Sequence, residues 1–326
     1  MLTPSDLIRL PYTPDLTEGG IAYAVRSLAY TYDRMGGSPL QRLRRITAGV
    51  AVELAFRRSL NKQSIPFDTL GTTPFTDPDH YDVSLGGHRC DLKSFHLTRR
   101  QQIRCVRRDP GLLLQAPALV PLDQHAAEGH RDDDLYLFAF LLGPVAASLT
   151  ETKKALRAGQ PTFLIHPLPD AWARPVGWTP LDPLVFKSEC PEPLWVEIGG
   201  QDAERRFVTQ TLNLLPRTRT VLQENLYTVA YLRVKRLPEA RLGLHSPLRG
   251  KPYLIQSFQW GNIWVYGMSI ILVGWITRQE FHRKAQLLPA GIPTFQYART
   301  KTKNLAVPMH TLHPLSELFA LLRQGR

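Results

Sequence analysis

Two aspartates and one lysine have a spacing that could support metal-ion chemistry. Asp82 precedes and Asp91 follows the pair Gly86-Gly87, which lies between two short runs of alternating polar and apolar residues. Such runs around two glycines predict a β-hairpin with the glycines at its turn. Asp82 then pairs with Asp91. Lys93, two residues further along, lies on the same face because side chains alternate along a strand.

The paired carboxylates would repel each other unless a cation lies between them. Directly opposed residues of a hairpin have Cβ atoms about 5 Å apart, and like charges at that separation are destabilising. A divalent cation reverses the sign, and carboxylate oxygens suit Mg²⁺ or Mn²⁺. The ammonium of Lys93 could then orient or help deprotonate a metal-activated water and balance the charge of a phosphate. These residues therefore predict a metal site for phosphate chemistry.

Glu53 is a fourth candidate for this site. Apolar residues at helical spacing predict a helix from Pro39 to Leu60, and Glu53 lies on or beside the apolar stripe. It is the only acid of that helix, which also carries five arginines. A carboxylate near a buried helix face needs a partner, and a metal site would supply one.

Two other interpretations of the acids stay open. Asp79 forms a literal Pro-Asp pair with Pro78, but its odd offset from Asp82 would place it on the opposite face of an extended strand. We therefore assign the metal role to Asp82. Alternatively, the hairpin acids form the exposed polar face of an edge hairpin, which leaves Glu53 and the neighbouring arginines unexplained.

The remaining pattern mixes helices and strands, which indicates an α/β fold. A basic helix is predicted at Leu97–Arg108, a solvated turn at His130–Asp134 and a strand buried on both faces at Asp134–Leu142, an almost continuously apolar run. The C-terminal predictions are a long buried strand over Ile263–Ile276, a short helix over Arg278–Leu287, a strand over Asn304–Val307 and a helix over Leu315–Leu322.

Residues 146–257 differ in sequence pattern from the segments on either side. Helical periodicity is scarce there, and short β-like runs alternate with prolines and glycines. These runs lie at Thr162–Ile165, Leu194–Ile198, Tyr227–Val234 and Tyr253–Ile255. We expect a β-rich insertion over 146–257, which serves in target recognition or interaction, between two parts of an α/β core at 1–145 and 258–326.

The order of the candidate residues resembles the PD-(D/E)XK nuclease superfamily, which has the restriction-endonuclease-like fold. In that family a helix acid precedes a β-hairpin that bears an aspartate and a (D/E)-x-K triplet. Here Glu53, Asp82 and Asp91-Leu92-Lys93 stand in that order. Ala48–Glu53 is similar to the family's helix around its acid, and Val273–Ile276 resembles a strand late in such domains. The resemblance covers both expected parts of the core.

The resemblance implies a mixed sheet flanked by helices and a metal-dependent hydrolysis of phosphodiester bonds. It implies three ligands for Mg²⁺ or Mn²⁺, namely Asp82, Asp91 and the backbone carbonyl of Leu92. Glu53 would bind this ion through water or help a second one. Lys93 would orient the nucleophile.

The balance of charge points to a polyanionic partner. Lys and Arg number 40 against 28 Asp and Glu, a formal net charge of +12, which suits nucleic acid or an anionic membrane surface. Arginines flank the predicted site in sequence, as contacts to phosphates would require. The predicted nucleic-acid-binding residues are Arg57, Arg58, Arg99, Arg100 and Arg104. A generic basic surface for solubility is the alternative.

Several classes of protein are disfavoured. Three scattered cysteines fit neither a disulfide framework nor a zinc site. No basic-then-apolar leader is visible, and the longest apolar run is about half a membrane span. We therefore expect a cytoplasmic protein. Walker, GxGxxG and GxSxG motifs do not occur, which argues against ATPases, nicotinamide-dependent enzymes and serine hydrolases.

The expected function is that of a Mg²⁺-dependent endonuclease acting on double-stranded DNA, in restriction or anti-phage defence, repair or mobile-element processing. One such site cuts one strand, so a double-strand break would need a homodimer or two events, and a protein partner stays open. The alternatives are a non-catalytic nucleic-acid-binding or scaffold protein on the same fold and an RNA-directed or partner-activated nuclease.

If Arg99 and Arg100 contact phosphates, DNA binding should weaken steeply as salt rises, because each neutralised phosphate releases a counterion. Replacing both with alanine should reduce the slope of log K against log [salt] by roughly two. Fluorescence anisotropy with a labelled duplex at several KCl concentrations measures this slope. An unchanged slope would mean that these arginines only solvate their helix.

Overall fold

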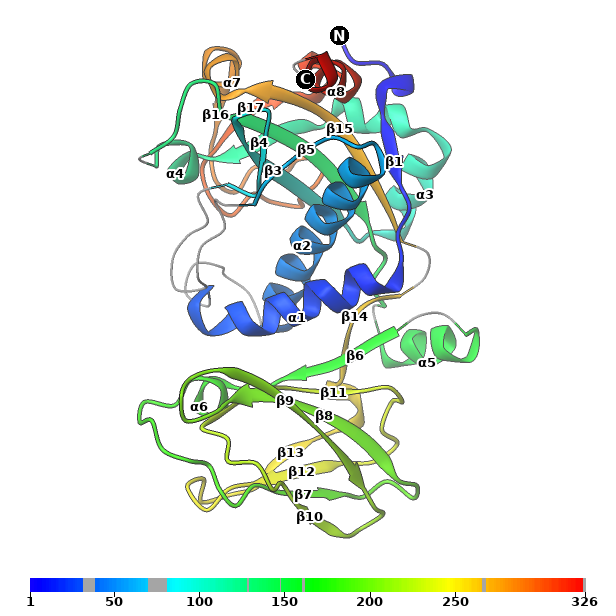
Figure 1. Ribbon diagram of the computed structural model, residues 1–326. Helices are drawn as coiled ribbons and strands as arrows, with labels where there is room; N and C mark the ends of the chain where they lie inside the picture. The colour runs from blue at the N-terminus through cyan, green and yellow to red at the C-terminus, as the bar shows by residue number, and fades with distance from the viewer. Residues whose placement is uncertain are drawn as a thin grey trace. The chain divides into compact units, whose positions relative to one another are not determined.

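The predicted hairpin forms one edge of a five-stranded sheet (Figure 1). The computed structural model describes residues 1–31, 39–69, 81–127, 129–146, 148–159, 162–265 and 268–324. The sheet has the order β1-β15-β5-β3-β2, formed by Ile8–Leu10, Ser269–Thr277, Leu135–Leu142, His88–Leu97 and Val83–Leu85 respectively. Strands β3 and β5 are parallel and the other neighbours antiparallel. The protein is therefore mixed α/β, as the sequence predicts.

Two compact units divide the chain. The first comprises Met1–Gly20, Thr47–Pro144 and Gly267–Arg326, and the second comprises Ile21–Ile46 and Val145–Tyr266. The boundary passes through helices α1 (Pro14–Thr31) and α2 (Pro39–Lys62). Residues 21–46 thus group with the second unit, whereas the sequence places them in the first part of the core. The helical pattern of the sequence continues across this boundary, so the sequence does not indicate where the two units divide.

Helix α2 confirms the helix predicted from Pro39 and has a definite end. Ser64 adopts a left-handed conformation (φ 54°), and two hydrogen bonds close the last turn. The Ile65 N–H donates to the Leu60 carbonyl and the Ser64 N–H to the Asn61 carbonyl, each at 3.0 Å. This is the Schellman arrangement, which satisfies carbonyls that a helix end leaves unpaired.

Helices α1 and α2 approach closely where glycines remove the side chain. A Cβ atom at Gly20 would lie 2.7 Å from the backbone oxygen of Thr47, and one at Gly19 would lie 2.8 Å from Leu54 Cδ1. Any larger residue would force the two helices apart at this point. The part of α2 that carries Glu53 is therefore fixed against the first turns of α1.

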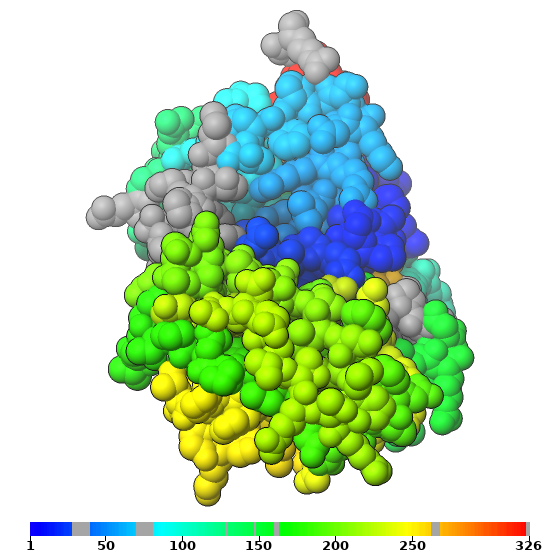
Figure 2. Space-filling view, turned by 60° about the horizontal axis from the view of Figure 1, so that its bottom comes forward, coloured from blue at the N-terminus to red at the C-terminus, as the bar shows by residue number. Residues whose placement is uncertain are grey.

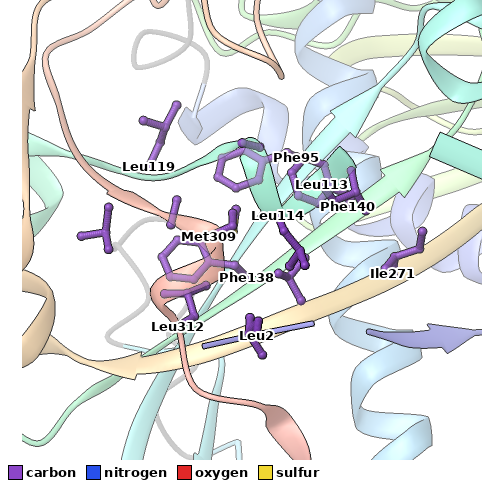
Figure 3. Close-up of a cluster of buried hydrophobic side chains, with 14 of the residues drawn as sticks. Leu2, Phe95, Leu113, Leu114, Leu119, Phe138, Phe140, Ile271, Met309 and Leu312 are labelled. Carbon is purple, nitrogen blue, oxygen red and sulfur yellow. The ribbon is translucent and has the colours of Figure 1, made fainter. Parts of the chain in front are cut away.

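A hydrophobic core packs against the main sheet of the first unit (Figure 3). Phe95, Phe138 and Phe140 of β3 and β5 pack with Leu113 and Met309 from outside the sheet. The other elements of this unit are α3 (Arg100–Arg108), α4 (Leu122–His125), α7 (Arg278–Lys284), α8 (Leu315–Gln324), the 3₁₀ helices η1 (Pro4–Asp6), η2 (Pro110–Gln115) and η4 (Met309–Thr311), and a second antiparallel sheet β16-β17-β4 (Gln286–Leu288, Asn304–Pro308, Pro117–Pro121). Among the described helices, none is long and apolar enough to cross a membrane.

The second unit is built on two antiparallel sheets, and the green and yellow surface in Figure 2 belongs to it. One has the order β10-β7-β12-β13 (Arg219–Val221, Val185–Ser188, Leu242–His245, Tyr253–Ile255) and the other β14-β6-β11-β8-β9 (Gly261–Val265, Thr162–Pro167, Thr228–Val234, Leu194–Gln201, Phe207–Leu214). Phe186 and Leu242 of the first sheet share a core with Ile198 and Leu232 of the second. The short elements α5 (Leu149–Arg157), α6 (Asp170–Ala173) and η3 (Ser257–Gln259) complete it.

The prediction of one long strand over Ile263–Ile276 is wrong. Strand β14 pairs in the five-stranded sheet of the second unit, whereas β15 pairs in the main sheet of the first. Both segments are apolar, so composition hides the change of sheet. The predicted helix Leu97–Arg108 is also shorter than expected, because β3 continues to Leu97 and α3 begins at Arg100.

Candidate active site

The hairpin has the register that the two glycines predict. Val83 lies opposite Cys90 and Leu85 opposite His88. Gly86 and Gly87 form the turn with φ values of 56° and 86°. A two-residue turn with positive φ at both positions matches the right-handed twist of the flanking strands, and glycine adopts it without steric cost. The turn thus fixes which residues of the hairpin share a face.

Asp91 and Lys93 share a face of β3, and their side chains form an ion pair. Lys93 Nζ lies 2.5 Å from Asp91 Oδ2, and the two side chains are 30% and 16% exposed in the order Asp91, Lys93. The intervening Leu92 and the preceding Cys90 are buried on the other face. The alternation therefore places the charged pair where solvent or substrate can reach it.

The carboxylate of Asp82 is held at the edge of β3. Asp82 lies just before β2, and its N–H still donates to the Cys90 carbonyl (3.0 Å). Its Oδ2 accepts a hydrogen bond from the Leu92 N–H (2.6 Å). The N–H and C=O of one residue in a strand point to the same side. The Leu92 carbonyl therefore faces the edge at which Asp82 lies.

The structure brings Glu53 near Asp82. Helix α2 lies against β3 at Gly49, where a Cβ atom would lie 3.8 Å from Ser94 Oγ and 3.9 Å from Glu53 Oε1. Burial raises the pKa of Asp82 well above its ordinary value, and the nearby charges of Glu53 and Asp91 raise this pKa further. Glu53 of α2 and Asp91 of β3 thus both repel the carboxylate of Asp82 at the start of the hairpin.

The donor atoms of this cluster suit Mg²⁺ in their chemistry. Carboxylates and a backbone carbonyl are hard oxygen ligands. Within the described ranges, however, no three His, Cys, Asp or Glu side chains already stand as a group that could hold a metal ion. Asp91 is paired with Lys93 and Asp82 with the Leu92 N–H, so a cation would have to draw oxygen atoms from these donors. Asp79, the alternative ligand, lies outside the described residues.

Two of the five predicted phosphate-binding arginines are engaged within the protein. Arg57 donates to the Asp82 carbonyl (2.8 Å). Arg58 forms an ion pair with Asp15 and donates to Thr13 Oγ1 (2.8 Å). These contacts hold α2 against the hairpin and against the start of α1. Three further predicted residues are exposed at the start of α3 or along it, namely Arg99, Arg100 and Arg104.

A buried ion pair joins the start of β3 to the start of β5. Arg89 donates from Nε (2.7 Å) and from its terminal nitrogen (2.6 Å) to the two carboxylate oxygens of Asp134, which is 6% exposed. The parallel register sets Cys90 opposite Leu135, so Arg89 and Asp134 meet one residue earlier. The prediction of a solvated turn is therefore wrong for Asp134, because this bidentate pairing allows its burial.

The sequence pattern did not reveal the residues of α4 and β5 beside the site. Lys93 Nζ donates to Gln124 Oε1 (3.0 Å). The adjacent His125 is buried, and its Nδ1 lies 3.0 Å from the Tyr136 hydroxyl. Burial lowers the pKa of His125 to about 4 and, together with the nearby charge of Asp91, raises that of Tyr136. The one signal in the sequence is that Gln124 and His125 come shortly after an apolar run that ends at Leu122.

Known proteins do not decide what this site does. Comparisons with protein families, with curated proteins and with solved structures found no match. A functional assignment therefore rests on the geometry and on the residue types.

Asp82→Asn should stabilise the protein at neutral pH. A carboxyl whose pKa is raised by folding binds more protons in the folded than in the unfolded state, so its ionisation lowers stability as pH rises above the ordinary pKa. Asparagine removes the charge and can still accept the Leu92 hydrogen bond. In EDTA, urea unfolding should show a gain at about pH 7.5 that shrinks towards about pH 4.

Asp123→Asn is the control for this experiment. Asp123 is an exposed carboxylate on α4, and its replacement should change the free energy of unfolding by less than about 0.5 kcal/mol at either pH. A loss of stability in Asp82→Asn at neutral pH would contradict the crowding of carboxylates at this place.

Proposed function

We propose that the protein is a Mg²⁺-dependent endonuclease that hydrolyses phosphodiester bonds in double-stranded DNA. The observation that carries the proposal is the gathering of Glu53, Asp82 and Asp91 beside the ammonium of Lys93. Carboxylates that repel one another lower the stability of a fold, and such arrangements concentrate at functional sites. A divalent cation is the ligand that most directly relieves the repulsion.

Each residue of the cluster has a part in this chemistry. Hydrolysis needs an attacking water and relief of negative charge on the phosphate, and a bound Mg²⁺ supplies a more acidic water and positive charge. Asp82, Asp91 and the Leu92 carbonyl would hold the ion, and Glu53 would bind it through water or help a second one. Lys93 keeps an ammonium next to Asp91, from where it can hydrogen-bond a phosphate oxygen or the attacking water.

The topology of the first unit supports a restriction-endonuclease-like fold. Helix α2 precedes the hairpin of β2 and β3, and the segment that contains α3 then connects β3 to the parallel strand β5. This order of helix, hairpin, helix and parallel strand resembles the one that the PD-(D/E)XK motif implies. We propose that the β-rich part of the second unit, within 145–266, is an inserted domain that takes part in target recognition.

A DNA substrate is supported by charge. The chain carries a formal net charge of +12, and a polyanion is the partner that such a balance favours. Arg99, Arg100 and Arg104 are exposed at the start of α3 or along it, and α3 closely follows the strand that bears the candidate site. Phosphate contacts from these residues would position the duplex without reading its sequence. Restriction or anti-phage defence, repair and mobile-element processing are settings that fit this activity.

One observation favours a non-catalytic alternative. The Asp91–Lys93 contact at 2.5 Å is the geometry of an ordinary ion pair, which would serve a DNA-binding or scaffold protein equally well. An RNA-directed or partner-activated nuclease is the other alternative. Cleavage assays on duplex DNA and on RNA, with Mg²⁺ and with EDTA, separate these possibilities.

Asp91→Ala should abolish cleavage without abolishing DNA binding. Loss of a direct metal ligand should lower the cleavage rate at least about 100-fold, since even indirect partners of a metal site contribute about 10- to 100-fold. Binding in EDTA should stay equal or strengthen slightly, because a negative charge facing phosphate is removed. Plasmid cleavage, anisotropy and melting temperature measure the three effects.

Asp123→Ala is a matched control, because it removes the same charge from an exposed position on α4. It should cleave like the wild type. Undiminished Mg²⁺-dependent cleavage by Asp91→Ala would refute the assignment of the site. A joint loss of binding and of melting temperature would show instead that the hairpin had unfolded.

A further inference from the structure

The ammonium of Lys93 has two acceptors of different character. Asp91 Oδ2 lies 2.5 Å from Nζ, and Gln124 Oε1 accepts a hydrogen bond from it at 3.0 Å. The carboxylate neutralises the ammonium, whereas the amide oxygen fixes its position and leaves its charge intact. Gln124 is therefore suited to hold a cationic group in place without cancelling it.

The helix that bears Gln124 is fixed by its surroundings. Helix α4 spans only Leu122–His125, too short to be stable on its own. It follows β4 directly, and the Leu122 N–H donates to the Lys303 carbonyl (3.0 Å), next to the pairing of β4 with β17. The backbone of α4 is thus anchored to a sheet at its first residue.

His125 anchors the other end of α4. Its Nδ1 lies 3.0 Å from the Tyr136 hydroxyl and its Nε2 lies 3.2 Å from His282 Nδ1. Its carbonyl oxygen accepts a hydrogen bond from Arg278 (2.6 Å). The buried ring therefore ties α4 to β5 and to α7, whereas the neighbouring Gln124 remains exposed except for its contact with Lys93. Among the described residues, Lys93 is the hydrogen-bond partner of the Gln124 side chain.

We propose that Gln124 is a positioning residue, which holds the Lys93 ammonium at the candidate active site during the reaction. The proposal rests on the proposed nuclease function. The Oδ2 atom of Asp91 cannot keep its full hydrogen bond to Lys93 while it holds a cation. The amide of Gln124 is then the contact that keeps Nζ in place, on a helix fixed at both ends. It acts through Lys93 and need not touch the substrate.

Gln124→Ala should lower turnover and leave DNA affinity unchanged. Misplacement of a charged catalytic group should reduce the single-turnover cleavage rate at saturating duplex by about tenfold or more. The dissociation constant for duplex in EDTA should stay within about twofold, because a neutral side chain is replaced. The melting temperature should not change, since α4 is anchored through Leu122 and His125. Asp123→Ala, on the same helix, should match the wild type in all three.

A second measurement needs neither metal nor cleavage. In EDTA, the rate at which an amine-specific reagent modifies Lys93, followed by peptide mass spectrometry, should rise about two- to tenfold in Gln124→Ala, because one hydrogen bond to the ammonium is lost. Lys303, an exposed lysine, is the internal control, and its rate should not change.

The outcomes separate this proposal from the proposed function. If the wild type cleaves no DNA, the nuclease function fails, and labelling still reports whether Gln124 holds Lys93. If the wild type cleaves and Gln124→Ala cleaves at the same rate, the positioning role is overturned. A slower rate with unchanged labelling of Lys93 overturns it as well, because Gln124 would then act by another route.

Discussion

Repulsion of the Asp82 carboxylate by Glu53 and by Asp91 is the constraint on which the first unit depends. These carboxylates come from a helix, from the residue before a strand and from the next strand. Burial and neighbouring charge oppose the ionisation of Asp82, so the fold loses stability by keeping the acids together at neutral pH. Other contacts of the fold must therefore offset the stability that is lost at this cluster.

Several independent contacts supply that stability. The glycine turn sets the register of the hairpin. The Arg89–Asp134 ion pair joins the start of β3 to the start of β5, close in sequence to Asp91. Arg57 ties α2 to the backbone of Asp82. The core that contains Phe138, the residue paired with Lys93 across β3 and β5, packs on the same face of the sheet as Asp91 and Lys93. Arg57, which the sequence predicts as a phosphate contact, thus serves to hold Asp82 in place.

Local periodicity predicted the parts of the site that depend on local structure. Alternation around Gly86-Gly87 placed Asp91 and Lys93 on one face, and a helical stripe placed Glu53 near the buried side of α2. Partners that are distant in the chain were not predictable in this way. Arg89 meets Asp134 only through the parallel pairing of β3 with β5, and no pattern marks Gln124 as a partner of Lys93. The division of Ile263–Ile276 between two sheets was missed because both segments are equally apolar.

The central claim is that the three carboxylates form a cation site, and binding of Mn²⁺ in the absence of DNA tests it most directly. Electron paramagnetic resonance counts free and bound Mn²⁺ during a titration of the full chain. We predict a site in the wild type that Mg²⁺ competes for, and its loss in the double variant Glu53→Gln and Asp91→Asn with the fold retained. Binding by the double variant equal to that of the wild type, or no binding by the wild type, would contradict the account.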